Sequence, residues 1–223
     1  MSKQTPNRPK PAATAPEQVR RKISTLWVII GAVAVVVVVA AVIAIVASGG
    51  DDTKTAAGIE QTRPVTVSGT PLPQFESTTD DPAIGTVVPT LTGASFDGTP
   101  VTVQPGKPTM VVFLAHWCPH CQREVPVLTQ WAANGGVPEG MDVIGVATGT
   151  SADRPNYPPS DWLERENFPF PVMADSADFD AANAYGLSAF PYFVVLDSKG
   201  QVVSRASGEL DPTTLTTMLQ SVA

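Results

Sequence analysis

The first strong pattern along the chain is a continuous apolar stretch near its N-terminus. Residues 26–47 contain no charged residue, and a helix rising about 1.5 Å per residue would cross a hydrocarbon layer of about 30 Å over that length. Residues 1–25 are rich in Pro, Lys, Arg and Thr and contain too few apolar side chains to fold. Residues 48–83 mix Gly, Asp, Thr, Ser and Pro without a sustained period. We therefore predict a disordered tail, a transmembrane helix and a flexible linker, in that order.

Charges at the two ends of the apolar stretch predict its orientation. Arg20, Arg21 and Lys22 precede it, whereas Asp51 and Asp52 follow it. The positive-inside rule then places the N-terminus in the cytoplasm and the rest of the chain outside the cell membrane. A cleaved signal peptide is the alternative, but its apolar core would usually have only about 7–15 residues. Both interpretations export the remainder, and we predict an uncleaved single-pass anchor.

From residue 84 onward, short apolar runs alternate with helical patterns and with Gly or Pro turns. This order predicts a single α/β domain over residues 84–223, with a central mixed sheet flanked by helices and preceded by an N-terminal hairpin. The predicted elements are a hairpin at 87–103, strands at 110–115, 141–147, 170–174, 191–196 and 201–205, and helices at 119–134, 161–166, 179–185 and 211–219.

Both cysteines and both histidines of the chain lie within residues 116–121, where a buried strand gives way to a helix. Pro119 suits the first helical position, so the sulfur of Cys118 is expected near the helix N-terminus, where a thiolate is favoured. The helix dipole contributes about 0.3–2 kcal/mol, whereas lowering a thiol pKa by about three units takes about 4 kcal/mol. We therefore expect His120 to donate a hydrogen bond or a positive charge to that sulfur. Cys121 lies on the same helical face and can close a disulfide with Cys118.

Other functions are compatible with the same residues. A disulfide across four residues could be structural, although so short a loop stabilises little. His116, Cys118, His120 and Cys121 could ligate zinc or copper, as in a metal-delivery or metal-sensing module. Adjacent residues at a strand end and a first helical turn diverge, however, and the chain has no second ligand pair, so we expect no resident metal. A tethered binding module without redox chemistry is a third possibility.

Charge limits the partners. The chain has 14 Lys and Arg against 21 Asp and Glu. Residues 1–47 hold six of the basic residues and one of the acidic ones, which leaves a net charge of −12 on the remainder. An exported domain with that charge repels nucleic acid, so we expect no nucleic-acid partner. The absence of cysteines outside the motif suits an oxidising compartment, because no stray thiol can mispair there.

Residues 113–126 resemble the thioredoxin superfamily, in particular its membrane-anchored extracytoplasmic TlpA-type branch. In that branch a Cys-x-x-Cys motif is followed by a glutamate and a proline, as Glu124 and Pro126 follow here. The Pro-His dipeptide between the cysteines is similar to that of DsbA, a periplasmic oxidant. The resemblance covers residues 84–223 and implies a thioredoxin fold with an N-terminal hairpin that joins the sheet.

The resemblance also implies roles for individual residues. Cys118 would attack or be attacked, Cys121 would resolve the mixed disulfide, and Glu124 would tune thiol ionisation and relay protons. The Phe190–Pro191 peptide would be the cis-proline that faces the motif, and with Trp117 it would bind the substrate. Cytoplasmic thioredoxins have a buried aspartate six residues before the first cysteine, whereas this chain has Val112 there.

These features predict a thiol-disulfide oxidoreductase without a cofactor. Its expected partners are exported cysteine-containing proteins and a membrane redox partner that recycles the cysteine pair. The direction of exchange stays open at this stage. The Pro-His dipeptide favours an oxidant, whereas the TlpA-type surroundings favour a reductant.

Overall fold

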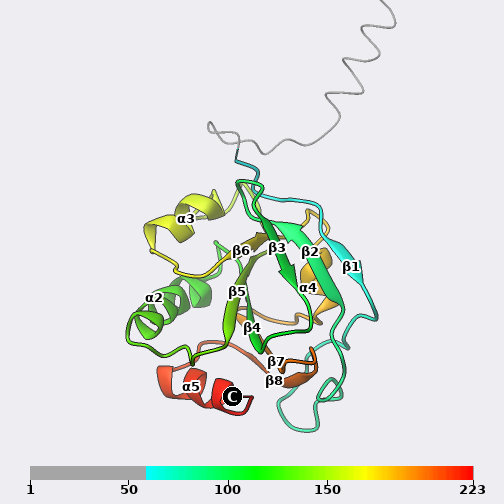
Figure 1. The fold of residues 1–223 in the computed structure, drawn as a ribbon. Helices are drawn as coiled ribbons and strands as arrows, with labels where there is room; N and C mark the ends of the chain where they lie inside the picture. Colours follow the sequence, from blue (N-terminus) through cyan, green and yellow to red (C-terminus); the bar gives the residue numbers. More distant parts are fainter. Residues whose placement is uncertain (1–58, 223) are drawn as a thin grey trace, which may run out of the picture. The chain divides into compact units, whose positions relative to one another are not determined.

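The computed structural model describes residues 59–222, which form a mixed five-stranded sheet, a three-stranded sheet and four helices (Figure 1). The strands are β1 (Thr66–Ser68), β2 (Thr90–Ala94), β3 (Pro100–Val103), β4 (Thr109–Leu114), β5 (Asp142–Ala147), β6 (Val172–Ala174), β7 (Tyr192–Leu196) and β8 (Val202–Ser207). The helices are α2 (Pro119–Ala133), α3 (Pro159–Arg165), α4 (Asp180–Ala184) and α5 (Pro212–Gln220). These bounds agree closely with the elements predicted for residues 110–219.

The five-stranded sheet has the order β6-β5-β4-β7-β8. Strand β4 pairs in parallel with β5 and antiparallel with β7, so the sheet is mixed, as the sequence predicted. Every residue of β4 is buried, because both faces of the sheet are covered. Met110, Val112 and Leu114 face the apolar cluster that includes residues of α2, α3 and α5. Val111 and Phe113 face a second cluster, which includes α4 and part of the three-stranded sheet.

The N-terminal hairpin corrects one expectation. Strands β2 and β3 form the predicted hairpin, but they do not join the main sheet. Strand β2 also pairs with β1, which gives a separate three-stranded sheet of order β1-β2-β3, and residues of this sheet belong to the second apolar cluster. Within the described residues, the bridge between Val87 and Gln201 is an isolated one and extends neither sheet.

The folded part also begins earlier than the predicted linker allowed. Residues 59–83 are part of the domain. Val67 in β1 pairs with Leu91, Leu72 and Phe75 are each 6% exposed, and the side chain of Gln61 is buried against Ser160 of α3. The prediction that the linker runs to residue 83 was therefore wrong, because these scattered apolar residues find partners far away in the sequence.

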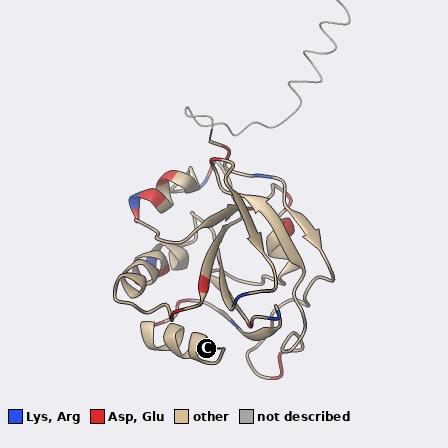
Figure 2. Cartoon of the chain, viewed as in Figure 1, with Lys and Arg blue, Asp and Glu red and all other residues tan. Residues whose placement is uncertain are grey.

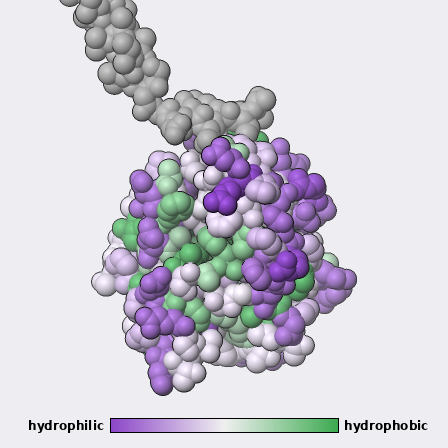
Figure 3. All heavy atoms as spheres, turned by 180° about the vertical axis from the view of Figure 1, so that it is seen from behind, coloured by the Kyte–Doolittle hydropathy of each residue, from purple (hydrophilic) through white to green (hydrophobic). Residues whose placement is uncertain are grey.

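The predicted tail and transmembrane helix, residues 1–25 and 26–47, lie outside the described residues. Within residues 59–222, no helix is both long and apolar enough to cross a membrane. Acidic and basic residues are distributed over several elements of this part and are absent from β4 and β7 (Figure 2). On the opposite face, hydrophobic residues gather near the centre with hydrophilic ones around them (Figure 3). The distribution of charged residues therefore does not identify one functional site.

Candidate active site

Cys118 lies between strand β4 and helix α2. It is the N-cap residue of α2, with extended backbone angles of φ −76° and ψ 120°, and Pro119 follows at the first helical position. Its main-chain N–H donates to the carbonyl of Ala115 at 3.0 Å, and its carbonyl accepts from Gln122 at 3.0 Å. No side chain caps this helix end, so its free N–H groups and its dipole favour a negative charge on the nearby sulfur. This placement confirms the predicted junction.

Cys121 occupies a different environment one turn further along. It is 0% exposed, against 6% for Cys118, and its Sγ accepts a hydrogen bond from the Ala115 N–H at 3.4 Å. Both cysteines are free thiols in this structure. Burial raises the pKa of the Cys121 thiol well above its ordinary range. Cys121 therefore holds its proton at neutral pH, which suits a resolving thiol better than an attacking one.

Glu124 is buried beside Cys121 rather than lying on the surface. Its side chain is 1% exposed, and Oε2 accepts a hydrogen bond from the Leu210 N–H at 3.0 Å. Within the described residues Oε1 has no hydrogen-bond partner. Burial, together with the negative charges of Glu209 and Asp211, raises the pKa of Glu124 to about 7. A carboxyl group that titrates near neutrality beside a buried thiol can take up and return a proton.

His120 does not make the predicted hydrogen bond to the Cys118 sulfur. Its side chain is 59% exposed, and Nδ1 lies 2.6 Å from Oε1 of Glu209 and 2.9 Å from Nη2 of Arg123. Arg123 in turn donates to both carboxylate oxygens of Glu209. The imidazole is therefore oriented by Glu209, which comes from the segment between β8 and α5. Sequence reasoning missed Glu209, because no local pattern links it to the motif.

His116 is a structural residue, and sequence analysis considered it only as a metal ligand. It is 1% exposed, and Nδ1 donates to the Pro155 carbonyl at 2.6 Å while Nε2 accepts from the Ser151 N–H at 3.2 Å. Burial lowers its pKa, which keeps the ring neutral. Both ring nitrogens are therefore engaged in holding the loop of residues 151–158. Within residues 59–222, no group of three or more His, Cys, Asp or Glu side chains is arranged to hold a metal ion.

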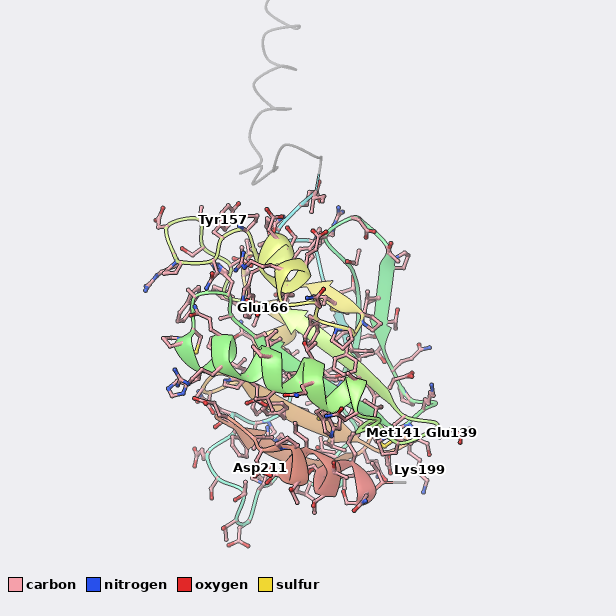
Figure 4. The ribbon with its side chains drawn as sticks, turned by 90° about the vertical axis from the view of Figure 1, so that its left-hand side faces the viewer. Glu139, Met141, Tyr157, Glu166, Lys199 and Asp211 are labelled. Atoms are coloured by element: carbon pink, nitrogen blue, oxygen red, sulfur yellow. The ribbon has the colours of Figure 1, made fainter. Side chains whose placement is uncertain are left out.

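Two of the predicted substrate-binding residues, Trp117 and Phe190, contact each other and pack against the apolar cluster that includes Cys118, and Pro191 follows Phe190. The indole N–H of Trp117 donates to the Gly149 carbonyl at 2.7 Å, and the rings of Trp117 and Phe190 meet edge to face with centroids 5.8 Å apart. The Phe190–Pro191 peptide is cis, as the resemblance implied. The guanidinium of Arg154 lies over the Trp117 ring, 5.3 Å from its centroid. Figure 4 looks onto α2, with the loop that carries Tyr157 on one side and Asp211 at the start of α5 on the other.

Comparison with known proteins agrees with this geometry. The methylamine utilization protein MauD of Methylobacillus flagellatus is 30% identical over 128 residues, which are 56% of this chain and 57% of MauD. The thiol-disulfide oxidoreductase ResA of Geobacillus thermodenitrificans is 25% identical over 142 residues, which are 63% of this chain and 78% of ResA. This chain thus spans only somewhat more than half the length of MauD.

Solved structures agree on the fold. The crystal structure of StoA from Bacillus subtilis aligns with 61% of this chain and 98% of StoA, at a TM-score of 0.51 and 17% identity. An identity that low supports the thioredoxin-like fold alone. The family model described as Redoxin matches residues 68–221, well over half of the chain. With its thioredoxin-like fold and its cysteine pair at the start of α2, the chain belongs to the Redoxin family.

Proposed function

We propose that this protein is a thiol-disulfide oxidoreductase in which Cys118 exchanges disulfides with substrate proteins and Cys121 resolves the mixed disulfide. The single observation that carries the proposal is the unequal setting of two thiols within one helical turn. Cys118 stands at the helix N-terminus, whereas Cys121 is fully buried and holds its proton. One thiol is thus set to react first and the other second.

In the reducing direction, the protein reduces a substrate disulfide in two steps. The Cys118 thiolate attacks a substrate disulfide, forms a mixed disulfide and releases one substrate thiolate, which takes up a proton. Cys121 then loses its proton and attacks the Cys118 sulfur, so that the second substrate sulfur leaves. The substrate gains two electrons and the Cys118–Cys121 pair loses two. Glu124, buried beside Cys121, is placed to accept that proton. The oxidising direction runs the same steps in reverse, and the reduction potential of the pair determines which one prevails.

The surroundings of Cys118 support a protein substrate rather than a small molecule. Trp117 and Phe190 form an aromatic wall beside the nucleophile, and the cis Phe190–Pro191 peptide continues directly into β7. We expect an extended substrate segment to lie along the aromatic wall, with its main chain next to Phe190 and its cysteine at Cys118. Aromatic side chains supply contact area at low cost in conformational entropy.

We further propose that residues 26–47 anchor the protein in the cell membrane and that the folded domain faces the extracytoplasmic side. The charge-free stretch and the basic residues that precede it support this arrangement. The substrates would then be exported proteins that contain cysteine, and a redox partner in the membrane would recycle the cysteine pair.

A trapping experiment tests the catalytic proposal. A Cys121→Ser variant cannot resolve mixed disulfides, so substrate proteins stay attached to Cys118 and appear as higher bands on non-reducing gels. The purified protein should also reduce insulin with dithiothreitol present, or refold scrambled ribonuclease. The Cys118→Ser variant is the matched control and should do neither. If Cys121→Ser traps nothing and the purified protein has neither activity, the proposal is wrong.

A further inference from the structure

The side chains of His120, Arg123 and Glu209 form a hydrogen-bonded cluster at the exposed side of the motif, with Glu209 at its centre. Arg123 Nε lies 3.0 Å from Oε1 and 3.1 Å from Oε2 of Glu209. His120 Nδ1 lies 2.6 Å from Oε1 of the same carboxylate. We call His120, Arg123 and Glu209 the charged cluster. Two of its members come from the first turns of α2, and the third comes from a segment 86 residues away from Arg123.

The segment that carries Glu209 contacts both sides of α2. While Glu209 binds the exposed residues His120 and Arg123, the next main-chain N–H, that of Leu210, donates to the buried Glu124. Asp211 follows and caps α5 with its side chain. The start of α5, marked by Asp211 in Figure 4, lies beside α2. Residues 209–210 therefore fix the charges on the Cys118 side and the carboxyl group on the Cys121 side together.

The electrostatics connect this cluster to the nucleophile. Hydrogen bonds from Arg123 and His120 lower the pKa of Glu209 to about 2, so Glu209 carries a full negative charge at working pH. The pKa of Arg123 is raised mainly by Glu209 and also by the negative charge of the Cys118 sulfur. Arg123 lies in the first turns of the helix that Cys118 caps, so its positive charge acts on the same end of α2, and Glu209 offsets part of that charge. The other acidic groups near this segment are Glu124, which lies on α2 itself, and Asp211 at the start of α5.

We propose that Glu209 is a positioning residue that sets how much positive charge from His120 and Arg123 acts on the Cys118 sulfur, and so sets the reactivity of the nucleophile. This inference rests on the proposed role of Cys118. With His120 protonated the cluster carries a net charge of +1, and removing the carboxylate raises it to +2. Glu209 thus restrains the ionisation of Cys118, and without it the thiol would be more reactive.

The test measures the alkylation rate of Cys118 in the reduced full-length protein, purified in detergent. The rate of modification by iodoacetamide at pH 5.5, followed by peptide mass spectrometry, reports the thiolate fraction of Cys118. A unit charge near the surface changes that fraction by up to about threefold, and by less when the thiol is already mostly ionised. Glu209→Gln should therefore react faster than the wild type, and Arg123→Gln more slowly by up to about threefold. The double variant restores a net charge of +1 and should react at close to the wild-type rate.

Two control variants distinguish an effect of charge on the alkylation rate from an effect of altered structure. Glu139→Gln removes an exposed carboxylate near the far end of α2 (Figure 4) and should leave the rate unchanged. Arg123→Lys keeps the charge but loses the bidentate geometry, and should react close to the wild-type rate even if Glu209→Gln does not fold. A cluster that merely ties α2 to α5 predicts equal rates for Glu209→Gln and the wild type, and that result would overturn the inference.

The same measurements distinguish failure of the proposed function from failure of the inference about Glu209. If wild-type Cys118 reacts no faster than free cysteine and the protein exchanges no disulfides, the proposed function fails. If the wild type exchanges disulfides but Glu209→Gln alkylates at the wild-type rate or more slowly, only the inference about Glu209 fails. A slow Arg123→Lys variant that behaves like Arg123→Gln would also contradict it, because the charge would then not be what matters.

Discussion

The two cysteines of the motif stand one helical turn apart and have opposite surroundings. Around Cys118 the chain places a helix N-terminus, the charged side chains of His120 and Arg123, and an aromatic wall. Around Cys121 it places apolar packing and one buried carboxyl group, Glu124. The first setting favours an anion, and the second disfavours one.

This difference explains how a pair of identical side chains can act in a fixed order. In the proposed exchange, the sulfur at the helix end meets the substrate first. The buried sulfur keeps its proton until the mixed disulfide has formed and then attacks, with Glu124 as the proposed base. Residues 209–210 contact the surroundings of both cysteines. The Glu209 carboxylate binds the His120 ring, and the Leu210 N–H donates to the Glu124 carboxyl group. The order of reaction therefore depends on the tertiary fold as well as on the four-residue motif.

The largest expected effect is the difference in reactivity between the two thiols. In the reduced wild-type protein at pH 7, iodoacetamide should modify Cys118 at least about 100-fold faster than Cys121, because Cys121 is inaccessible and its pKa is raised by burial. Peptide mass spectrometry of quenched samples measures both rates in one experiment. In 8 M urea the two rates should become similar. Equal rates in the folded protein would remove the distinction between the two settings.

The second effect concerns Glu124 and its pH dependence. Its pKa is about 7 in the folded protein and 4.5 in its ordinary state, so the folded state holds the proton more strongly between those values. Its contribution to stability is therefore fully present below pH 4.5 and is lost as the pH rises through 7. Glu124→Gln cannot ionise, and its amide oxygen can still accept from Leu210. Relative to wild type, the variant should gain about 3 kcal/mol of unfolding free energy between pH 4.5 and pH 8.

Guanidinium unfolding of the reduced proteins at several pH values measures this gain. Glu139→Gln, which removes an exposed carboxylate, is the matched control and should follow the wild-type curve. The insulin-reduction rate of the wild type should show an inflection near pH 7, and Glu124→Gln should lose it. If the difference in stability between Glu124→Gln and wild type is the same at pH 4.5 and pH 8, Glu124 is not the buried titrating group described here.

Much of the main sheet and its helices was predictable, because their signals are local. Residues of β4 form an uninterrupted apolar run, Pro119 begins α2, and Asp211 begins α5 with the capping bonds expected of it. Strand β1 was missed, because it has only three residues and sits among Pro, Gly and Thr. Its stability comes from pairing with β2 and from apolar neighbours in α4 and β7, and no pattern within the segment encodes those contacts.

The features of the candidate site also divide into those that the sequence predicts and those that it does not. The cysteine pair and the cis Phe190–Pro191 peptide were predictable from a motif and from the resemblance that it carries. The partners of His116 and His120 were not, because Pro155 and Glu209 lie 39 and 89 residues away in the sequence. A histidine in a motif suggests chemistry, but only the tertiary structure tells whether its ring nitrogens are free. Here one histidine holds a loop, and the other is oriented by a carboxylate.

A smaller effect tests the loop on the Cys118 side. His116→Asn can replace the donor to Pro155 but leaves the Ser151 N–H without its acceptor, which should cost about 1 kcal/mol of unfolding free energy. Because burial lowers the pKa of His116, its contribution to stability should fade as the pH drops below about 6.5. Hydrogen exchange should quicken in residues 151–158, while Cys121 stays protected from iodoacetamide. Faster modification of Cys121 would mean that the two settings are not independent.

The smallest effect concerns the aromatic wall. Phe190→Leu removes the edge-to-face contact with Trp117, worth about 0.5–1.5 kcal/mol for such pairs, and should lower kcat/KM for insulin about threefold. Reduction of a small disulfide such as oxidised glutathione should be unaffected, since it does not reach along the wall, and the alkylation rate of Cys118 should stay the same. Phe179→Leu, at the exposed N-cap residue that precedes α4, is the control. Equal losses with insulin and glutathione would show that Phe190 supports Cys118 itself rather than the substrate, which would place the wall within the setting of the nucleophile.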